Sequence, residues 1–234
     1  MVLLRLLKTV LLAGMMLVVL YQAGVFVLVL WYGFYNPSST AVMQQTLREL
    51  RRENPDAQLQ HQWVPYDQIS THLKRAVVAS EDANFVKHSG VEWADIRRAW
   101  EYNRRQAASG RNAMRGGSTI TQQLAKNLFL SNDRSYVRKG QELIITYMIE
   151  LTMSKQRILE LYLNSAQWGE SVFGAQAAAR HYFKVDASRL GPSQSARLAS
   201  MLPRPAYYDR KGVTRYLQSR TATIQQRMRL VEVP

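Results

Sequence analysis

One apolar run dominates the hydrophobic pattern near the N-terminus. From Thr9 to Tyr35 the chain carries no charged residue and is rich in Leu, Val, Met and aromatic side chains. The run is longer than the ~20 residues that a helix needs to cross a bilayer. A secretory signal would have a shorter apolar region and a small-residue cleavage site. The pattern predicts an uncleaved transmembrane helix over residues 9–35, and Arg5 and Lys8 predict a cytoplasmic N-terminus over residues 1–8.

Beyond this run, a polar connector precedes a helical domain. Residues 36–62 are polar and punctuated by Pro37 and Pro55, which is typical of a juxtamembrane segment, with a short helix expected from Thr40 to Arg52. The expected domain covers residues 63–234; from Leu73 onward its apolar positions mostly follow helical spacing, and no neighbouring runs alternate with period two. We therefore expect an all-α globular domain on a stalk.

Three stretches of this domain carry specific expectations. Residues 91–105 are amphipathic, with Trp93 and Trp100 on one side. The basic, glycine-rich stretch from residue 106 to residue 117 is expected to form a loop. Residues 135–153 are apolar on nearly every face, which predicts a buried central helix.

The charge of the chain narrows the classes of partner. There are 31 Lys and Arg against 17 Asp and Glu, a formal net charge of +14. Such an excess suits a polyanion: nucleic acid, an anionic lipid surface or a phosphate-bearing substrate. The predicted membrane anchor argues against nucleic acid. The lack of cysteine excludes disulfides and thiolate metal sites, and the four histidines show no metal-binding spacing.

The stretch RGGSTITQQLAKN, residues 115–127, combines a helix start with a row of hydrogen-bond donors. Thr119 and Gln122 have the spacing of a capping box. Together with Gln123 and Lys126 they share one stripe of the helix, roughly opposite an apolar stripe. The backbone N–H groups at the helix start suit an anion, but no Lys precedes the Ser-Thr pair as a Walker A motif requires. The spacing leaves two interpretations open, a capped surface helix and an anion-binding site.

Two glutamates are candidates for catalysis in this cationic chain. Glu81 follows an apolar helical turn, where its pKa would be raised, as a general acid or base requires. Glu142 falls near the start of the most hydrophobic helix of the domain, so its carboxylate needs a partner. The local candidates are Arg134, Arg138 and Lys139. An acidic loop and a structural salt bridge are the simpler interpretations, but two carboxylates together are a pattern of glycosyl chemistry.

Five segments, taken in order, resemble the peptidoglycan glycosyltransferases of family 51. They are SEDANFVKHSG, GGSTITQQLAKN, RKGQE, ILELYLNSAQWG and ARLASMLPRP, and the similarity runs from about Trp63 to Tyr208. The resemblance implies a lysozyme-like helical glycosyltransferase domain with a small membrane-facing jaw, and polymerisation of the lipid-linked precursor lipid II into glycan strands. Larger relatives carry a transpeptidase domain after this one. A chain that stops at Pro234 therefore resembles the monofunctional form.

The resemblance also implies roles for individual residues. Glu81 would be the general base that deprotonates the acceptor's 4-hydroxyl, and Glu142 the second essential glutamate. The acceptor oxygen would invert the donor's anomeric carbon and release undecaprenyl pyrophosphate. The residues expected to bind the pyrophosphate and the sugars are Ser118, Thr119, Gln122, Gln123, Lys126, Asn127, Arg134, Arg138 and Lys139. A divalent cation, Mg²⁺ or Mn²⁺, is a candidate cofactor with Glu142 as its candidate ligand, and no organic cofactor is expected.

A location and partners follow from the same resemblance. The expected location is the bacterial cytoplasmic (inner) membrane, with a single span, a cytoplasmic N-terminus and a periplasmic catalytic domain. The expected partners are lipid II, the lipid-linked glycan strand, the membrane and other cell-wall synthesis or division proteins, with no nucleic acid. Two alternatives stay open: a lysozyme-like murein hydrolase or lytic transglycosylase, and an inert membrane-anchored scaffold.

Overall fold

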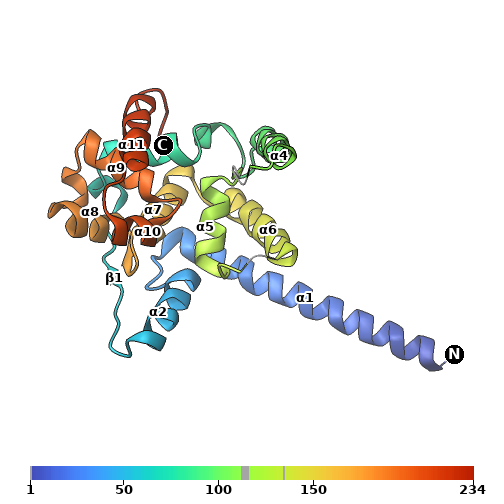
Figure 1. Cartoon of the computed structure of the whole chain (residues 1–234). Coiled ribbons are helices and arrows are strands. Elements are labelled where there is room, and N and C mark those ends of the chain that lie inside the picture. The colour runs from blue at the N-terminus through green and yellow to red at the C-terminus, as the bar shows by residue number, and fades with distance from the viewer. Residues whose placement is uncertain (1, 112–115, 134) are drawn as a thin grey trace.

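The protein is described by a computed structural model that covers residues 2–111, 116–133 and 135–234. It is built almost wholly of helices, which confirms the predicted all-α class (Figure 1). The helices are α1 (Val2–Phe34), α2 (Ala41–Glu53), α3 (Thr71–Glu81), α4 (Trp93–Ala108), α5 (Ile120–Phe129), α6 (Tyr136–Thr152), α7 (Lys155–Ser165), α8 (Ala175–Phe183), α9 (Pro192–Met201), α10 (Pro205–Lys211) and α11 (Arg215–Arg227). Strands β1 (Gln60–His61) and β2 (Val172–Phe173) pair in parallel, with Gln60 opposite Val172. Short 3₁₀ helices cover Tyr66–Gln68, Phe85–Lys87 and Ala187–Arg189.

Short polar side chains and one proline set the starts of several helices. The Thr119 hydroxyl accepts a hydrogen bond from the backbone N–H of Gln122, and the Gln122 side chain accepts one from the backbone N–H of Thr119. This reciprocal pair is the predicted capping box of α5. Ser154 caps α7, and Pro192 occupies the first turn of α9, where its missing N–H costs nothing.

The buried centre of the domain is α7 and not α6. Residues 161–165 of α7 are all buried, and α5 packs against this helix. In contrast, α6 exposes Tyr136, Val137 and Leu151 and buries the side that carries Glu142. The prediction of a buried central helix over 135–153 is therefore wrong. The prediction failed for a physical reason: apolar residues on every face of a helix do not specify whether protein or lipid covers them.

Two groups of helices place the candidate residues. On one side α9 packs against α3 and α11. On the other side α5 packs against α2, α6 and α7, and Figure 1 shows α5 in the middle of the molecule.

Helix α2 and strand β1 lie in the predicted juxtamembrane segment 36–62, and Val42 and Met43 of α2 pack against Phe173 of β2. This segment is therefore tied to the domain.

The C-terminal part of α1 is docked on the domain, and the rest of the helix projects from it (Figure 1). Among the described residues, α1 is the helix that is long and apolar enough to cross a membrane, which is consistent with the predicted anchor. Val25 and Val29 are buried. Arg157 of α7 donates to the carbonyl oxygens of Tyr32 and Tyr35 at 2.9–3.1 Å. These bonds satisfy carbonyl groups that a helix end leaves unpaired.

A reciprocal amide pair joins α1 to α6. Gln22 Nε2 donates to Gln141 Oε1 at 2.7 Å, and Gln141 Nε2 donates to Gln22 Oε1 at 3.0 Å. Gln22 is a polar residue within the apolar run, and Gln141 directly precedes Glu142. The pair therefore links the predicted anchor helix to the helix that carries Glu142.

Breaking this amide pair is expected to weaken the docking of α1. We expect Gln22→Leu and Gln141→Leu each to lower the free energy of unfolding by about 1 kcal/mol, because each leaves the other amide unpaired in apolar surroundings. The double variant should lose less than the sum, since two leucines leave no unpaired group. Denaturation in detergent micelles measures these losses. Additive losses would contradict a direct interaction between the two amides.

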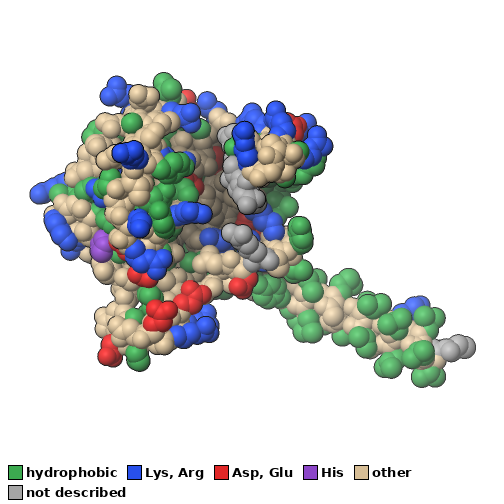
Figure 2. Space-filling model, in the orientation of Figure 1, with side chains coloured by type: hydrophobic (Ala, Val, Ile, Leu, Met, Phe, Trp, Pro, Cys, Tyr) green, Lys and Arg blue, Asp and Glu red, His purple; other side chains and the backbone are tan. Residues whose placement is uncertain are grey.

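Helix α4 stands apart from the main body across a hollow that Figure 2 shows with charged side chains on its walls. It buries Ala99 but leaves Trp93 and Trp100 60% and 59% exposed. The predicted amphipathic pattern is present, but the domain does not cover its apolar side. The helix also continues to Ala108, so the first three residues of the predicted loop over 106–117 are helical, and residues 112–115 of that prediction lie outside the described residues.

Candidate active site

Glu81 is the last residue of α3, and a hydrogen bond holds each of its carboxylate oxygens. Ser80 Oγ donates to Glu81 Oε1 at 3.0 Å, and Gln123 Nε2 donates to Glu81 Oε2 at 2.9 Å. Burial raises the pKa of Glu81, and these two hydrogen bonds offset part of that effect. A carboxylate with a raised pKa and a fixed orientation is suited to take a proton from a hydroxyl group.

Tyr162 of α7 fixes Gln123 in turn. The Tyr162 hydroxyl donates to Gln123 Oε1 at 2.9 Å, so the NH₂ group of Gln123 faces Glu81. Burial raises the pKa of Tyr162 well above its usual value, which keeps the hydroxyl protonated and able to donate. The sequence pattern does not single out Tyr162, because 39 residues separate it from Gln123. Its place in the segment ILELYLN is its one sequence signal.

Glu142 is the centre of a second cluster, on α6. Arg138 Nη1 lies 2.7 Å from Glu142 Oε2, and Lys139 Nζ contacts Glu142 Oε1. Spacings of three and four residues place these side chains on one face of the helix. Glu142 is 3% exposed, so the buried carboxylate is paired as predicted. Lys139 Nζ also donates to Ser118 Oγ at 3.1 Å, which ties α6 to the residues before α5.

Lys126 of α5 adds a third cation to this cluster. Its Nζ donates to Asn132 Oδ1 at 3.1 Å. Burial lowers the pKa of Lys126, Glu142 raises it, and the charges of Arg138 and Lys139 lower it. Three cations around one carboxylate leave an excess of positive charge, which a bound anion would relieve. The cluster therefore has the charge that a phosphate-bearing group requires.

Helix α5 connects the two clusters. Gln123 and Lys126 are three residues apart, so they lie about one turn apart on the same face of the helix. Gln123 contacts Glu81, and Lys126 interacts with Glu142. A substrate whose reacting carbon is attached to a phosphate can therefore contact the carboxylate and the cations at once.

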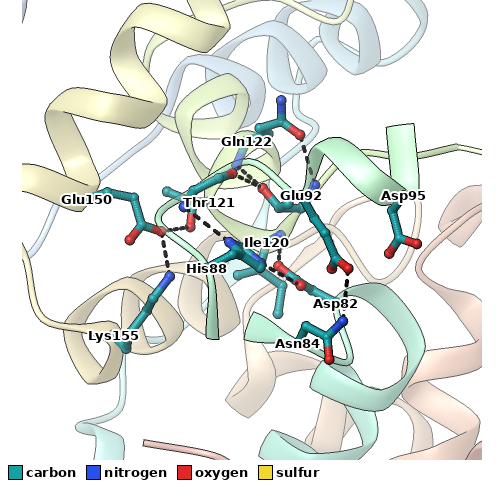
Figure 3. A network of polar contacts seen from close by, with 12 residues as sticks. Asp82, Asn84, His88, Glu92, Asp95, Ile120, Thr121, Gln122, Glu150 and Lys155 are labelled. Carbon is teal, nitrogen blue, oxygen red and sulfur yellow. Dashed lines mark hydrogen bonds and ion pairs between the residues drawn. The ribbon is translucent and has the colours of Figure 1, made fainter. Parts of the chain in front are cut away.

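A buried network holds the chain that follows α3 (Figure 3). Gly90 N–H donates to His88 Nδ1 at 3.1 Å, so His88 Nε2 carries the hydrogen that it donates to Asp82 Oδ1 at 2.8 Å. The other Asp82 oxygen accepts from the backbone N–H of Ile120 at 3.0 Å. Thr119 Oγ1 donates to the Gly90 carbonyl at 2.6 Å. The network therefore fixes the end of α3 against the start of α5.

Gly90 belongs to this network and has no room for a side chain. Its φ is +89°, and a Cβ there would lie 2.8 Å from side-chain carbons of Thr146 and Glu150. We expect Gly90→Ala to lower the free energy of unfolding by about 2 kcal/mol, from backbone strain and overpacking together. Gly110 is the matched control, because its φ is +69° but no atom of the described residues lies within 4 Å of a Cβ there. Equal losses in denaturant unfolding of Gly90→Ala and Gly110→Ala would contradict this packing.

The described residues offer no free ligand set for a divalent cation. Asp82, His88 and Glu92 lie close enough together to hold a metal ion, but Asp82 and His88 bind each other and neighbouring backbone N–H groups. Both oxygens of Glu142 contact cationic side chains, whose charges repel a metal ion. Glu142 in this arrangement does not fit direct ligation of Mg²⁺ or Mn²⁺, and the expected cofactor stays a prediction.

The predicted binding residues fall into different environments. Five of them belong to the two clusters or contact them: Ser118, Gln123, Lys126, Arg138 and Lys139. Thr119 and Gln122 are buried and form the capping box, so both side chains hold the helix start, and their expected contact with a ligand stays a prediction. Asn127 is buried on α5, and Arg134 lies outside the described residues.

Comparisons with known proteins identify the family. The family model described as transglycosylase matches residues 44–229. A Bordetella pertussis (strain Tohama I) protein named biosynthetic peptidoglycan transglycosylase is 63% identical over 230 residues, which cover 98% of this chain and 95% of the relative. Proteins of the same name from Methylobacillus flagellatus and Herminiimonas arsenicoxydans are 53% and 51% identical, over 96% and 98% of this chain and of each relative.

The matched region contains both clusters. It includes Glu81, the whole of α5, and Glu142 with its cationic neighbours. The relatives also align with nearly the full length of the chain. The chain therefore belongs to the transglycosylase family and is a peptidoglycan glycosyltransferase.

Proposed function

We propose that this glycosyltransferase polymerises lipid II, with Glu81 as the general base and the cluster around Glu142 as the binding site for the pyrophosphate of the donor. The observation that carries the proposal is the arrangement along α5. Gln123 holds a carboxylate with a raised pKa, and about one turn further Lys126 belongs to a group with excess positive charge. Glycosyl transfer from a pyrophosphate needs both a base for the acceptor and positive charge for the leaving group.

The base acts on the acceptor sugar. Glu81 takes the proton of the acceptor's 4-hydroxyl as its oxygen forms a bond to the anomeric carbon of the donor. The bond from that carbon to the pyrophosphate breaks on the opposite face, and its electron pair leaves with undecaprenyl pyrophosphate. One displacement of this kind inverts the anomeric carbon. The hydrogen bonds from Ser80 and Gln123 hold the carboxylate in place before the proton moves.

The cations stabilise the leaving group. Negative charge builds on the pyrophosphate as the bond breaks, and cations fixed in advance lower the free energy of that state. Glu142 has a supporting part, because it holds Arg138 and Lys139 in position. A half-buried Lys126 with a lowered pKa is still cationic when a phosphate group lies beside it, since the anion favours its charged form.

We also propose that α1 spans the bacterial cytoplasmic membrane with the catalytic domain on the periplasmic side. Arg5 and Lys8 near the free end of α1 support a cytoplasmic N-terminus. The uncharged part of α1, from Thr9 onward, is about 40 Å long at ~1.5 Å per residue, which is enough to cross the apolar part of a bilayer. The exposed apolar side chains of α6, which packs beside α1, would then face lipid next to the site of a lipid-linked substrate.

Inversion at the donor carbon is a direct test of the proposed displacement. The full chain in detergent receives lipid II labelled with ¹³C at the donor anomeric carbon, and NMR couplings report the configuration in the product. We expect the configuration opposite to that of lipid II. Retention would contradict a single displacement assisted by Glu81. Release of free sugar would support the alternative of a hydrolase, which does not need a cationic cluster.

A further inference from the structure

Arg220 lies on α11, outside the segments that carry the family resemblance, yet it reaches the candidate base. Helix α11 packs against α9 and α3, and Arg220 is half-buried at that contact. Its Nη2 donates to Ser80 Oγ at 3.2 Å, and Ser80 Oγ lies 3.0 Å from Glu81 Oε1. The buried Nε of Arg220 has no partner among the described residues.

We propose that Arg220 is a positioning residue for the glycosyl transfer, which acts on Glu81 through the Ser80 hydroxyl. This inference rests on the proposed function, because it assigns Glu81 the role of base. On this account two chains of hydrogen bonds converge on one carboxylate. One chain runs from Tyr162 through Gln123 to Oε2 of Glu81. The other runs from Arg220 through Ser80 to Oε1.

The hydroxyl of Ser80 has one hydrogen and two possible acceptors. Glu81 Oε1 lies at 3.0 Å and the carbonyl oxygen of Ala199 at 3.3 Å. Arg220 donates to the Ser80 oxygen, so this oxygen acts as an acceptor toward Arg220. The hydroxyl hydrogen therefore points to Glu81 Oε1 or to the Ala199 carbonyl oxygen. The nearer, charged acceptor holds the hydrogen while Glu81 is ionised. When Glu81 has taken a proton, the Ser80 hydrogen can turn to the carbonyl oxygen of Ala199. The Ser80 hydroxyl therefore has an acceptor whether Glu81 is ionised or protonated.

The distance of Arg220 from the carboxylate matters for its effect. Burial raises the pKa of Glu81, the charge of Asp82 raises it further, and Arg220 lowers it. Tyr162 faces the same site from α7 in its neutral form. A direct ion pair between Arg220 and Glu81 would stabilise the carboxylate so strongly that it would be a weak base. An arginine that acts through one hydroxyl keeps Glu81 ionised at neutral pH and still able to accept a proton.

The test compares rates of lipid II polymerisation by the full chain across pH. We expect Arg220→Gln to lower kcat at neutral pH by roughly tenfold, the effect of losing one hydrogen bond to a charged group, with KM near the wild-type value. The loss of a positive charge raises the pKa of the base, so the acid limb of the pH–rate profile should move to higher pH. Ser80→Ala should show the same movement, and the double variant should be no slower than the slower single variant.

Two further variants separate positioning from folding. Arg220→Lys keeps the charge, so it should recover part of the rate. Arg227→Gln removes an exposed arginine from the same helix and should leave rate and profile unchanged. A profile of Arg220→Gln that superimposes on the wild-type profile would overturn the proposal, whether the rate is normal or uniformly low. If Arg220→Gln does not fold, a wild-type profile of Ser80→Ala overturns it instead. A wild-type chain that makes no polymer would refute the proposed function and not this inference alone.

Discussion

Glu81→Gln is expected to lower the rate of lipid II polymerisation by about 10²–10⁴-fold, the usual contribution of a general base. The amide keeps the size of the side chain but cannot take the proton of the acceptor hydroxyl. Because burial raises the pKa of Glu81, its ionised form destabilises the folded state at neutral pH, and that cost disappears as the pH falls through the raised pKa. The variant should therefore unfold at the same temperature as the wild type or higher.

Initial rates with labelled lipid II and a thermal melt in the same detergent measure these two effects. Glu81→Asp is a useful companion, because it retains the carboxylate but draws it back from Gln123 and Ser80. It should be slow but faster than Glu81→Gln. Polymerisation by Glu81→Gln at the wild-type rate would remove Glu81 from the chemistry.

Lys126→Ala is expected to lower turnover by about 10²–10³-fold while the protein remains folded. The substitution removes one of the cations around Glu142, so less positive charge is available when the pyrophosphate leaves. Lys211→Ala, which removes an exposed lysine on α10, is the control and should have the wild-type rate. If Lys126→Ala fails to fold, Lys126 is a structural residue and the anion-binding role assigned to it is wrong.

The pKa of Lys126 gives this residue a signature in the pH profile. Burial lowers that pKa, so the free enzyme loses the cation at a lower pH than an ordinary lysine would. The fall of kcat/KM at alkaline pH should therefore report the loss of the proton from Lys126. In Lys126→Arg the charge persists at high pH, and this limb should move to higher pH. An alkaline limb that does not move would contradict the assignment.

Much of the candidate site could be predicted because its signals are local. The capping box of Thr119 and Gln122 depends on a spacing of three residues, and the pairing of Glu142 with Arg138 and Lys139 depends on spacings within one helix. The long apolar helix α1 follows from composition alone. Short-range patterns of this kind are visible before the chain folds.

The contacts that refine the site are long-range and were beyond such patterns. Ser80 and Arg220 are 140 residues apart, and no periodicity relates residues on α3 and α11. Gln122 and Gln123 share the polar stripe of α5 and have the same side chain. The capping box turns Gln122 inward, and Gln123 donates a hydrogen bond to Glu81. The exposed tryptophans of α4 show the same limit, because an amphipathic pattern does not say what covers its apolar side.

The most direct test of the central claim, that Glu81 and the cationic cluster carry out strand synthesis, gives the purified full chain two substrates in parallel. One reaction contains labelled lipid II, and the other contains preformed glycan strands without lipid II. Electrophoresis resolves the strand lengths, and thin-layer chromatography follows undecaprenyl pyrophosphate. We predict that lipid II becomes long strands with one undecaprenyl pyrophosphate released per bond formed, and that preformed strands keep their length. Absence of polymer from lipid II, or shortening of the preformed strands, would contradict the account.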